Sequence, residues 1–486
     1  MKIRFTYLSE INIYAIGAMV FFIAALFSSG YHHFDEHFQI LEFTSLKLHI
    51  AKENDMPWEY AAKMRSALQP LFVITFYKLL SIVGPVNPFI LSTFLRLLSA
   101  ALAFYCTYQL IQCFGQSLSE KYRSRLLLPL SFFLWFGVYN AVRFSSENWS
   151  AMLLILSLCL LTGSTIKGYK TYLYAGLLLG GAFLLRFQTG FMILGLAIWL
   201  LFIRKERIGS LFLTAATIFA VVAAGVLIDK WFYGVWTLSC WNYFDQNILQ
   251  DKVSGFGVYP WWWYVSETFL NTIPPFSLVY LLGLLIFFVL HPRHLFTFIL
   301  IPFLLVHFYI GHKEIRFLFP VIYFLPLCIA FTIQAVNQKW SVPLLGQRAF
   351  KFFLPGFWLV NFVMLLVVMF KPADSYIDLY ETIYNRYTAP TKLYGLNENP
   401  YHRVLDIHFY KRASLSLNLI NNTSEIQAGK DSIVLLATTD RNAAEQLTQP
   451  HKLIYSGLPE WVRAFNYNRW LDRTKIWYVY EIENRN

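Results

Sequence analysis

The sequence predicts an all-α polytopic membrane protein with a small α/β domain at its C-terminal end. Of its 486 residues, 57% are hydrophobic, 19% are aromatic and only 14% are charged. A water-soluble fold of this length could not bury so much apolar surface, so most of the chain is expected to lie in a bilayer. Apolar runs of helix length recur up to residue 370, and shorter runs of strand length follow.

Eleven apolar runs are expected to form transmembrane helices, because each approaches the ~20 residues that cross a hydrocarbon core as a helix. We expect the first run to be retained, since no small-residue cleavage site follows it. A further apolar stretch, residues 67–86, is predicted to be interfacial or re-entrant. The eleven runs are residues 11–29, 91–113, 126–141, 149–164, 171–185, 189–203, 209–228, 268–290, 295–310, 317–335 and 352–370.

The distribution of charge predicts the orientation. With a cytoplasmic N-terminus, the inner segments carry fourteen Lys or Arg residues against three acidic residues, a bias typical of cytoplasmic loops. Counting residues 67–86 as a crossing would invert every later loop and remove this bias. Topology therefore accounts for the net charge of +12, and no nucleic-acid partner is expected. The inner segments are residues 1–10, 114–125, 165–170, 204–208, 291–294 and 336–351.

The domain organisation follows from the same pattern. Residues 1–370 are predicted to form the transmembrane domain, and residues 30–87 its first non-cytoplasmic loop, with interfacial helices. Residues 371–486 are predicted to form the small α/β domain, on the non-cytoplasmic side because the number of crossings is odd. Within it, residues 433–437 and 476–482 are expected to be strands, and residues 440–449 a helix.

The most unusual polar segment is His-Phe-Asp-Glu-His-Phe-Gln at residues 33–39, directly after the first apolar run. Helical spacing from Asp35 predicts an amphipathic helix on the membrane surface, with an acidic edge facing something polar. We interpret Asp35 and Glu36 as candidate catalytic carboxylates; the alternative is an Asp that only caps a short helix. The flanking candidates are His33 and His37. The polar stripe is Asp35, Gln39 and Glu42, and the other stripe is Phe38, Leu41, Ser45 and Leu48.

Four further polar groups are predicted to meet on the same non-cytoplasmic face. Charges at a membrane boundary are functional candidates by default, whereas snorkelling to the interface is the alternative for a single arginine. The groups are Trp58 and Glu59 with Arg65 in the first loop, Arg143 and Glu147 between two helices, Arg186 in a helical hairpin, and His312, Lys313 and Arg316 between two later helices.

These residue types suit transfer from a lipid-linked phosphate. The cations His312, Lys313 and Arg316 could bind a phosphate at headgroup depth and stabilise it as a leaving group. A carboxylate such as Asp35 could deprotonate an acceptor hydroxyl. One base and a phosphate leaving group correspond to an inverting glycosyl transfer. The sequence has no Gly-rich phosphate loop and no Asp-x-Asp metal motif, so no metal or other cofactor is expected.

The order of several motifs resembles the multispanning mannosyltransferases that use dolichyl-phosphate mannose, glycosyltransferase family 22. The resemblance is strongest to the branch that adds the third mannose of glycosylphosphatidylinositol anchors, and it spans roughly residues 30–320. One departure is Phe34, where the family usually has proline. The motifs are His-x-Asp-Glu-x-Phe-Gln-x-Leu-Glu (33–42), Trp-Glu-Tyr (58–60), Arg-Ser (65–66), the aromatic and amide-rich block 241–264, and His-Lys-Glu-x-Arg-Phe-Leu-x-Pro (312–320).

The resemblance implies a GT-C fold and a mannosyltransferase. The donor would be a polyprenyl-phosphate mannose, the acceptor a lipid-linked glycan, and the product an α-1,2 linkage. It also implies that Asp35 is the catalytic base, with Glu36 and residues 312–316 shaping the acceptor and donor sites. Asn242, Tyr259 and Trp261 would contribute to substrate binding, although a plain aromatic belt is the alternative. The expected location is a bacterial inner membrane or the endoplasmic reticulum, with the active site on the periplasmic or lumenal side.

Two other functions fit part of the pattern. A related lipid-linked transferase could use another sugar, such as an aminoarabinose or glucose carrier. A transporter also carries intramembrane charges, but it should show polar breaks near helix midpoints and matching halves. Here the charges crowd one face and no halves match.

Overall fold

The computed structural model describes residues 9–163, 168–340, 348–427, 432–440 and 442–483. The chain forms two compact units. The first, here called the helical unit, comprises Met1–Ser28, Ala62–Leu71 and Thr93–Lys371. The second, the sheet unit, comprises Ser29–Ala61, Phe72–Ser92 and Pro372–Asn486, so it combines parts of the first long loop with the C-terminal region.

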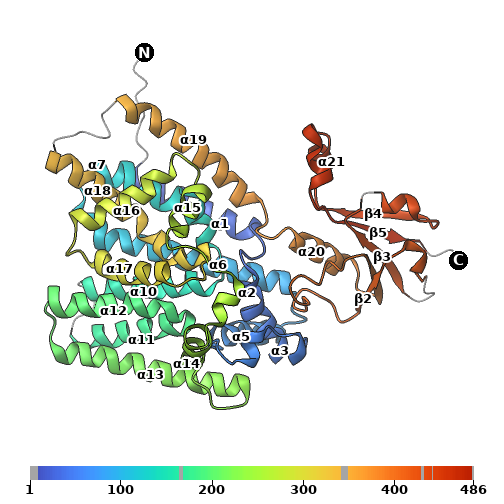
Figure 1. The fold of residues 1–486 in the computed structure, drawn as a ribbon, viewed down its shortest axis with the longest axis horizontal. Helices are drawn as coiled ribbons and strands as arrows, with labels where there is room; N and C mark the ends of the chain where they lie inside the picture. The colour runs from blue at the N-terminus through green and yellow to red at the C-terminus, as the bar shows by residue number, and fades with distance from the viewer. Residues whose placement is uncertain (1–8, 164–167, 341–347, 428–431, 441, 484–486) are drawn as a thin grey trace. The chain divides into compact units, whose positions relative to one another are not determined.

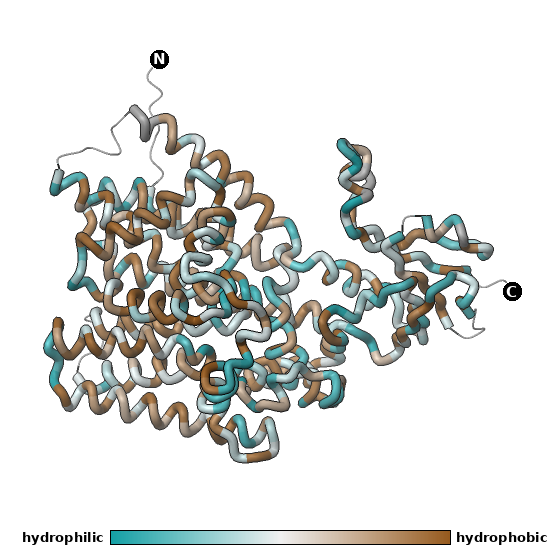
Figure 2. Tube along the Cα trace, viewed as in Figure 1, coloured by the Kyte–Doolittle hydropathy of each residue, from teal (hydrophilic) through white to brown (hydrophobic). Residues whose placement is uncertain are grey.

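Four helices in the described part of the chain are long and apolar enough to cross a membrane alone. Figure 2 shows their mainly hydrophobic composition. All eleven predicted runs coincide with helical segments, so the helical prediction is confirmed; the number of crossings stays a prediction. The four helices are α1 (Glu10–Phe27), α6 (Pro88–Phe114), α13 (Ile208–Tyr233) and α19 (Arg348–Phe370).

Two broken helices bring polar residues into the helical unit. Helix α9 (Trp135–Ala141) meets α10 (Ser146–Thr162) at 95°, and the 3₁₀ segment η9 (Ile315–Tyr323) meets α18 (Leu325–Trp340) at 60°. If each bent pair is one span, the described residues contain up to six candidate spans. Both Arg143 and Glu147 lie at the first break, and Arg316 lies near the start of the second pair.

Side chains replace the backbone hydrogen bonds that these breaks remove. The Asn148 Nδ2 group donates to the carbonyl oxygens of Arg143 (2.7 Å) and Ala141 (3.3 Å). The predicted run 126–141 is itself split at Leu134, where Asn361 donates to Phe133 O and accepts from Trp135 N–H. Because unpaired backbone groups are costly in a bilayer, these two asparagines make the breaks possible.

The other helices of the helical unit are shorter (Figure 1). Close approach of α11 to α13 depends on glycine: a Cβ atom on Gly180 would lie 2.6 Å from the Val221 Cβ. These helices are α8 (Leu128–Phe133), α11 (Tyr169–Leu185), α12 (Gly190–Ile198), α14 (Ser239–Phe244), α15 (Trp263–Asn271), α16 (Ser277–Leu290) and α17 (Leu295–Tyr309). Helix α5 (Leu68–Ser81) has 14 residues, or about 21 Å, short of a ~30 Å hydrocarbon core.

The sheet unit contains a five-stranded mixed sheet in the order β2-β1-β3-β5-β4 (Figure 1). Strands β2, β1 and β3 are parallel, whereas β5 pairs antiparallel with both β3 and β4. Helix α20 (Tyr376–Arg386) precedes the sheet. The strands are β1 (Thr391–Leu396), β2 (Leu415–Ile420), β3 (Ile433–Thr438), β4 (His451–Ser456) and β5 (Tyr478–Ile482).

The two predicted strands are confirmed as β3 and β5, but the helix predicted over residues 440–449 is wrong. Its described part holds only the short 3₁₀ helix Ala443–Gln446. The side chains of Thr438 and Asp440 accept hydrogen bonds from backbone N–H groups two residues later, which favours turns over a helix. Pro450 further disfavours a helical conformation at the preceding residue.

The predicted amphipathic helix after Asp35 exists, but it is not a surface helix. It is built from α2 (Phe34–His37), the π-helical η1 (Phe38–Glu42) and α3 (Phe43–Lys47). The π turn shifts the register by one residue, so His37 and Glu42 bond to each other at a separation of five. From His37 to Ser45 every residue except Gln39 is buried. The predicted separation into a polar and an apolar stripe is therefore wrong.

Candidate functional site

A carboxylate shared by two arginines forms the centre of the charged cluster in the helical unit. Glu147 is in the first turn of α10, directly after the break. Its Oε1 atom lies 3.1 Å from Arg186 Nη1 and 3.2 Å from Arg316 Nη1. All three residues are at most 5% exposed, and the two guanidinium groups lie 5.0 and 5.2 Å from the centre of the Phe317 ring. Three of the predicted site residues are thus brought together from different helices.

His312 and Glu314 extend this cluster. Glu314 accepts hydrogen bonds from Arg316 Nε and, at 3.0 Å, from His312 Nε2. The hydrogen bond to Glu314 raises the pKa of His312 above its ordinary value, which favours the imidazolium form. Arg186 and Arg316 balance the charges of Glu147 and Glu314, so the cluster carries one positive charge in excess when His312 is an imidazolium. Such a cluster is suited to an anion.

Lys313 has a different set of partners. Its Nζ atom donates to the carbonyl oxygens of His307 (3.0 Å), Phe308 (2.9 Å) and Ile310, at the C-terminal end of α17. An ammonium group has three N–H donors, and these carbonyls use all of them. Lys313 is 2% exposed and therefore caps this helix end, where a cation also interacts favourably with the helix dipole.

Arg143 is also buried at the first break, with 1% of its surface exposed. Its Nη2 group donates to the Ser28 hydroxyl, its Nε donates to Tyr139 O (3.2 Å), and its guanidinium lies 4.5 Å from the centre of the Tyr139 ring. Arg143 thereby connects the end of α1 to the α9–α10 break.

The remaining predicted residues of the helical unit lie in its loops, except Asn242, which is in α14. Arg65 packs over the Tyr243 ring at 5.2 Å. Asn242 donates to the carbonyls of Ala62 and Lys63, both at 3.2 Å, so its amide fixes the neighbouring loop. Tyr259 packs against Trp263 at 4.9 Å and is partly exposed, and Trp261 is among the exposed aromatic residues.

In the sheet unit, Asp35 occupies the first turn of α2. The N-cap is His33, whose Nδ1 atom accepts from Asp35 N–H at 3.2 Å, so the capping role considered for Asp35 belongs to the histidine. The Asp35 side chain is 24% exposed and its Oδ1 lies 3.6 Å from His33 Nδ1. Glu36 accepts from His32 N–H at 2.9 Å. The Asp35 carboxylate is thus placed by local structure and remains accessible.

Glu42 is a buried carboxylate of the sheet unit. Its Oε1 accepts from His37 Nε2 (2.8 Å) and from the backbone N–H groups of His408 (2.8 Å) and Phe409 (3.0 Å). Burial favours a raised pKa, but the hydrogen bond and charge of His37 with the two N–H groups outweigh it and hold the pKa of Glu42 below its ordinary value. Gln39 donates to Glu59 at 3.2 Å, and Trp58 begins the short helix α4 (Trp58–Ala61).

Sequence analysis missed several residues that hold these clusters. Phe317 lies under both guanidinium groups, and Ser28 accepts from Arg143. Arg403 pairs with Asp374 at 3.1 Å and lies 5.1 Å from the centre of the Phe34 ring. Apart from the contact between the adjacent residues Arg316 and Phe317, these contacts join residues that are distant in the sequence, so no local signal could have predicted them.

The fold is similar to that of two solved structures of one protein. ArnT from Cupriavidus metallidurans, in the structure bound to undecaprenyl phosphate, covers 97% of this chain and 97% of its own, with a TM-score of 0.55 and 10% identity. Its apo structure gives a TM-score of 0.51 over 92% of this chain and 96% of its own. This likeness and the apolar helices define an integral membrane protein of the GT-C fold class.

Residues 12–414 match the Alg9-like mannosyltransferase family, and the chain belongs to that family. Among curated relatives, GPI alpha-1,2-mannosyltransferase 3 of Bos taurus is 28% identical over 64% of this chain and 57% of its own length. The Homo sapiens protein of that name is 27% identical over 64% and 55%, and Mannosyltransferase APTG1 of Arabidopsis thaliana is 26% identical over 65% and 57%. The chain therefore spans a little over half the length of these relatives.

Proposed function

We propose that the protein is an inverting mannosyltransferase that moves mannose from a polyprenyl-phosphate mannose to a hydroxyl group of a lipid-linked glycan. Family membership and the names of the curated relatives support mannose as the sugar and an α-1,2 linkage as the product. Binding of undecaprenyl phosphate by the structurally similar ArnT supports a polyprenyl lipid as the carrier. The observation that carries the proposal is the buried cluster around Glu147, with its excess of positive charge.

In the proposed reaction, Arg186, Arg316 and His312 bind the donor phosphate. Its negative charge would compensate the positive excess of the cluster, and charge-assisted hydrogen bonds would strengthen as the phosphate departs. Lys313 supports this site indirectly, by holding the end of α17. Glu147 keeps the two guanidinium groups close together in the absence of lipid.

Asp35 acts as the general base. The acceptor oxygen forms a new bond to mannose C1 while its proton moves to the Asp35 carboxylate. The bond between C1 and the phosphate oxygen breaks, and its electron pair leaves with the polyprenyl phosphate, so a β-linked donor yields an α-linked product. No metal or other cofactor takes part. Glu36 and the remaining predicted residues shape the acceptor and donor sites: His33, Gln39, Trp58, Glu59, Arg65, Arg143, Tyr259 and Trp261. The buried residues His37, Glu42 and Asn242 contribute through the loops that they hold.

The donor site is tested by Arg316→Ala in the purified, detergent-solubilised protein. Each charge-assisted contact to phosphate contributes roughly 1.5–3 kcal/mol, so the KM for polyprenyl-phosphate mannose should rise by about tenfold or more. His312→Ala should raise it as well. The donor KM of both variants is measured from product formation with a mannosyl acceptor and radiolabelled donor. The same assay with polyprenyl-phosphate glucose or aminoarabinose tests which sugar is transferred.

Arg123→Ala is the matched control, because Arg123 pairs with Glu10 at 2.7 Å elsewhere in the helical unit. It should leave the donor KM unchanged. If Arg316 only joins Glu147 and Glu314, its removal would lower thermal stability and leave the KM at the wild-type value. An unchanged KM in folded Arg316→Ala and His312→Ala proteins would contradict the phosphate site, and turnover of glucose or aminoarabinose in preference to mannose would contradict the sugar.

We further propose eleven crossings with a cytoplasmic N-terminus, residues 371–486 on the opposite face, and an active site on the periplasmic or lumenal side. The excess of fourteen cations over three acids in the inner segments supports this orientation. Single cysteines at Ser124 and Gln427, in a background without the five native cysteines, should react with an impermeant maleimide from opposite sides of sealed vesicles. Labelling of both from one side would show that the topology is wrong.

A further inference from the structure

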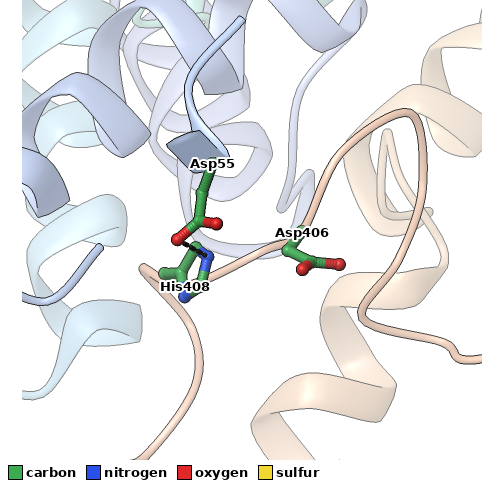
Figure 3. A group of neighbouring side chains, drawn as sticks. All are labelled: Asp55, Asp406 and His408. Atoms are coloured by element: carbon green, nitrogen blue, oxygen red, sulfur yellow. Dashed lines mark ion pairs between the residues drawn. The ribbon is translucent and has the colours of Figure 1, made fainter. Parts of the chain in front are cut away.

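Three metal-ligating side chains from distant parts of the sequence meet in the sheet unit. They are Asp55, Asp406 and His408, and Figure 3 shows the Asp55 carboxylate beside the His408 ring with Asp406 nearby. Each residue offers one ligand atom, and these atoms lie within 4.8 Å of one another. The closest pair is Asp55 Oδ2 and His408 Nε2, at 3.2 Å. All three residues are partly buried, so solvent reaches the group.

The spacing of these atoms fits a common metal ion. Zinc bonds to carboxylate oxygen and imidazole nitrogen at about 2.0–2.2 Å, which places neighbouring ligand atoms of a tetrahedral site roughly 3.3–3.6 Å apart. The Asp55 and His408 atoms are 3.2 Å apart, so a small shift would give that separation. Asp406 has the most exposed side chain of the three, at 47%, and a rotation about its side-chain bonds would bring its oxygen into the same shell. Water would complete four-coordination.

His408 Nε2 is the atom that most needs a partner. It is buried from solvent and makes no hydrogen bond within the described residues, although Asp55 Oδ2 is close. A buried polar nitrogen without a hydrogen bond is uncommon and calls for an explanation. A metal ion between Nε2 and the two carboxylates would satisfy it and would offset the two negative charges.

Neighbouring groups contact each of the three residues. Lys52 N–H donates to Asp55 Oδ2 at 3.1 Å, and His402 Nδ1 is 2.7 Å from Asp406 Oδ1. The backbone of His408 is fixed by the buried Glu42, 2.8 Å from its N–H group. Such outer contacts orient the ligands of metal sites and tune their affinity.

We propose that Asp55, Asp406 and His408 bind one structural Zn²⁺ ion, which ties the first loop to the segment before β2. The imidazole ligand favours zinc over Mg²⁺ and Ca²⁺, which prefer oxygen ligands. The zinc site takes no part in the proposed transfer, so the zinc proposal rests on observations that are independent of the proposed function.

Metal content and thermal stability test the site in the purified full-length protein after treatment with EDTA and dialysis against Zn²⁺, Mn²⁺ or Mg²⁺. Zinc should bind at about one equivalent per chain and raise the melting temperature by about 3 °C or more. Asp406→Asn, which preserves side-chain size at a half-exposed position, and His408→Gln should lose both effects. Glu483→Gln and His451→Ala replace an exposed acid and an exposed histidine of the same unit, and should behave like wild type.

Equal zinc content in wild type and Asp406→Asn would overturn the proposal. So would a melting temperature that zinc does not change, because a structural ion must stabilise the folded state. Stoichiometric binding of manganese with no zinc bound would overturn the identity of the ion. Mannosyl transfer by the EDTA-treated protein, measured in parallel, reports on the function alone.

Discussion

Replacement of Asp35 by asparagine is expected to lower turnover by about 10²–10⁴, while donor KM and thermal stability stay near wild type. Asparagine preserves the size of the side chain and most of its hydrogen-bonding capacity, but cannot accept the proton of the acceptor hydroxyl. His33 and not Asp35 provides the N-cap, so α2 should keep its first turn. Single-turnover product formation at saturating donor and acceptor measures the effect.

Two neighbouring substitutions control for this result. Glu53→Gln removes an exposed carboxylate from the same loop and should leave turnover unchanged. Glu36→Gln distinguishes the role of Glu36 from that of Asp35. It should lower turnover less than Asp35→Asn, because the Glu36 side chain binds His32 N–H. Retention of more than half the activity by Asp35→Asn would exclude this residue as the base.

Glu147→Gln is expected to give the largest loss of stability, about 3–5 kcal/mol of the free energy of unfolding. The substitution leaves the buried Arg186 and Arg316 guanidinium groups facing each other without their shared counter-charge. Loss of one partner from a buried ion pair is costly because the other charge stays desolvated. Thermal unfolding in detergent, followed by fluorescence, measures the change.

The matched control is Glu10→Gln, whose carboxylate pairs with Arg123 at 2.7 Å but is one-third exposed, at 33%. An exposed pair of this kind contributes about 0–1 kcal/mol, so the two glutamine variants should differ clearly. The double variant Glu147→Gln/Arg186→Gln should regain part of the lost stability, since it removes one of the two cations that Glu147 would otherwise neutralise. Equal melting temperatures for Glu147→Gln and Glu10→Gln would contradict the role of the shared carboxylate.

The tertiary contacts give two predicted site residues, Lys313 and Glu42, a role that differs from the predicted one. Lys313 was predicted to bind phosphate because it stands between His312 and Arg316, but its three donors bind the carbonyls at the end of α17. Glu42 was predicted to face a polar substrate, but it is buried and bonded to His37 and to the backbone at His408. Both are charged groups that stabilise the loops on which exposed residues are placed.

The sequence by itself determined the features that depend on local patterns. Apolar length located the eleven runs between residues 11 and 370 that overlap helices, and strand-length apolar runs located β3 and β5. It did not reveal β1, whose Lys392 and Gly395 interrupt the strand pattern, or β2 and β4 at the two edges of the sheet. The order of the motifs along the chain indicated the mannosyltransferase family, and the family match over residues 12–414 agrees.

Only the tertiary structure decided where helices break and which charges meet. The split at Leu134 depends on Asn361, more than 200 positions later, and the shared carboxylate joins residues from α10, the end of α11 and η9. The Asp-x-His pair at Asp406 and His408 is visible in the sequence, but Asp55 is supplied by the first loop. Long-range hydrogen bonds and ion pairs have no periodicity along the chain, so a local pattern contains no information about their partners.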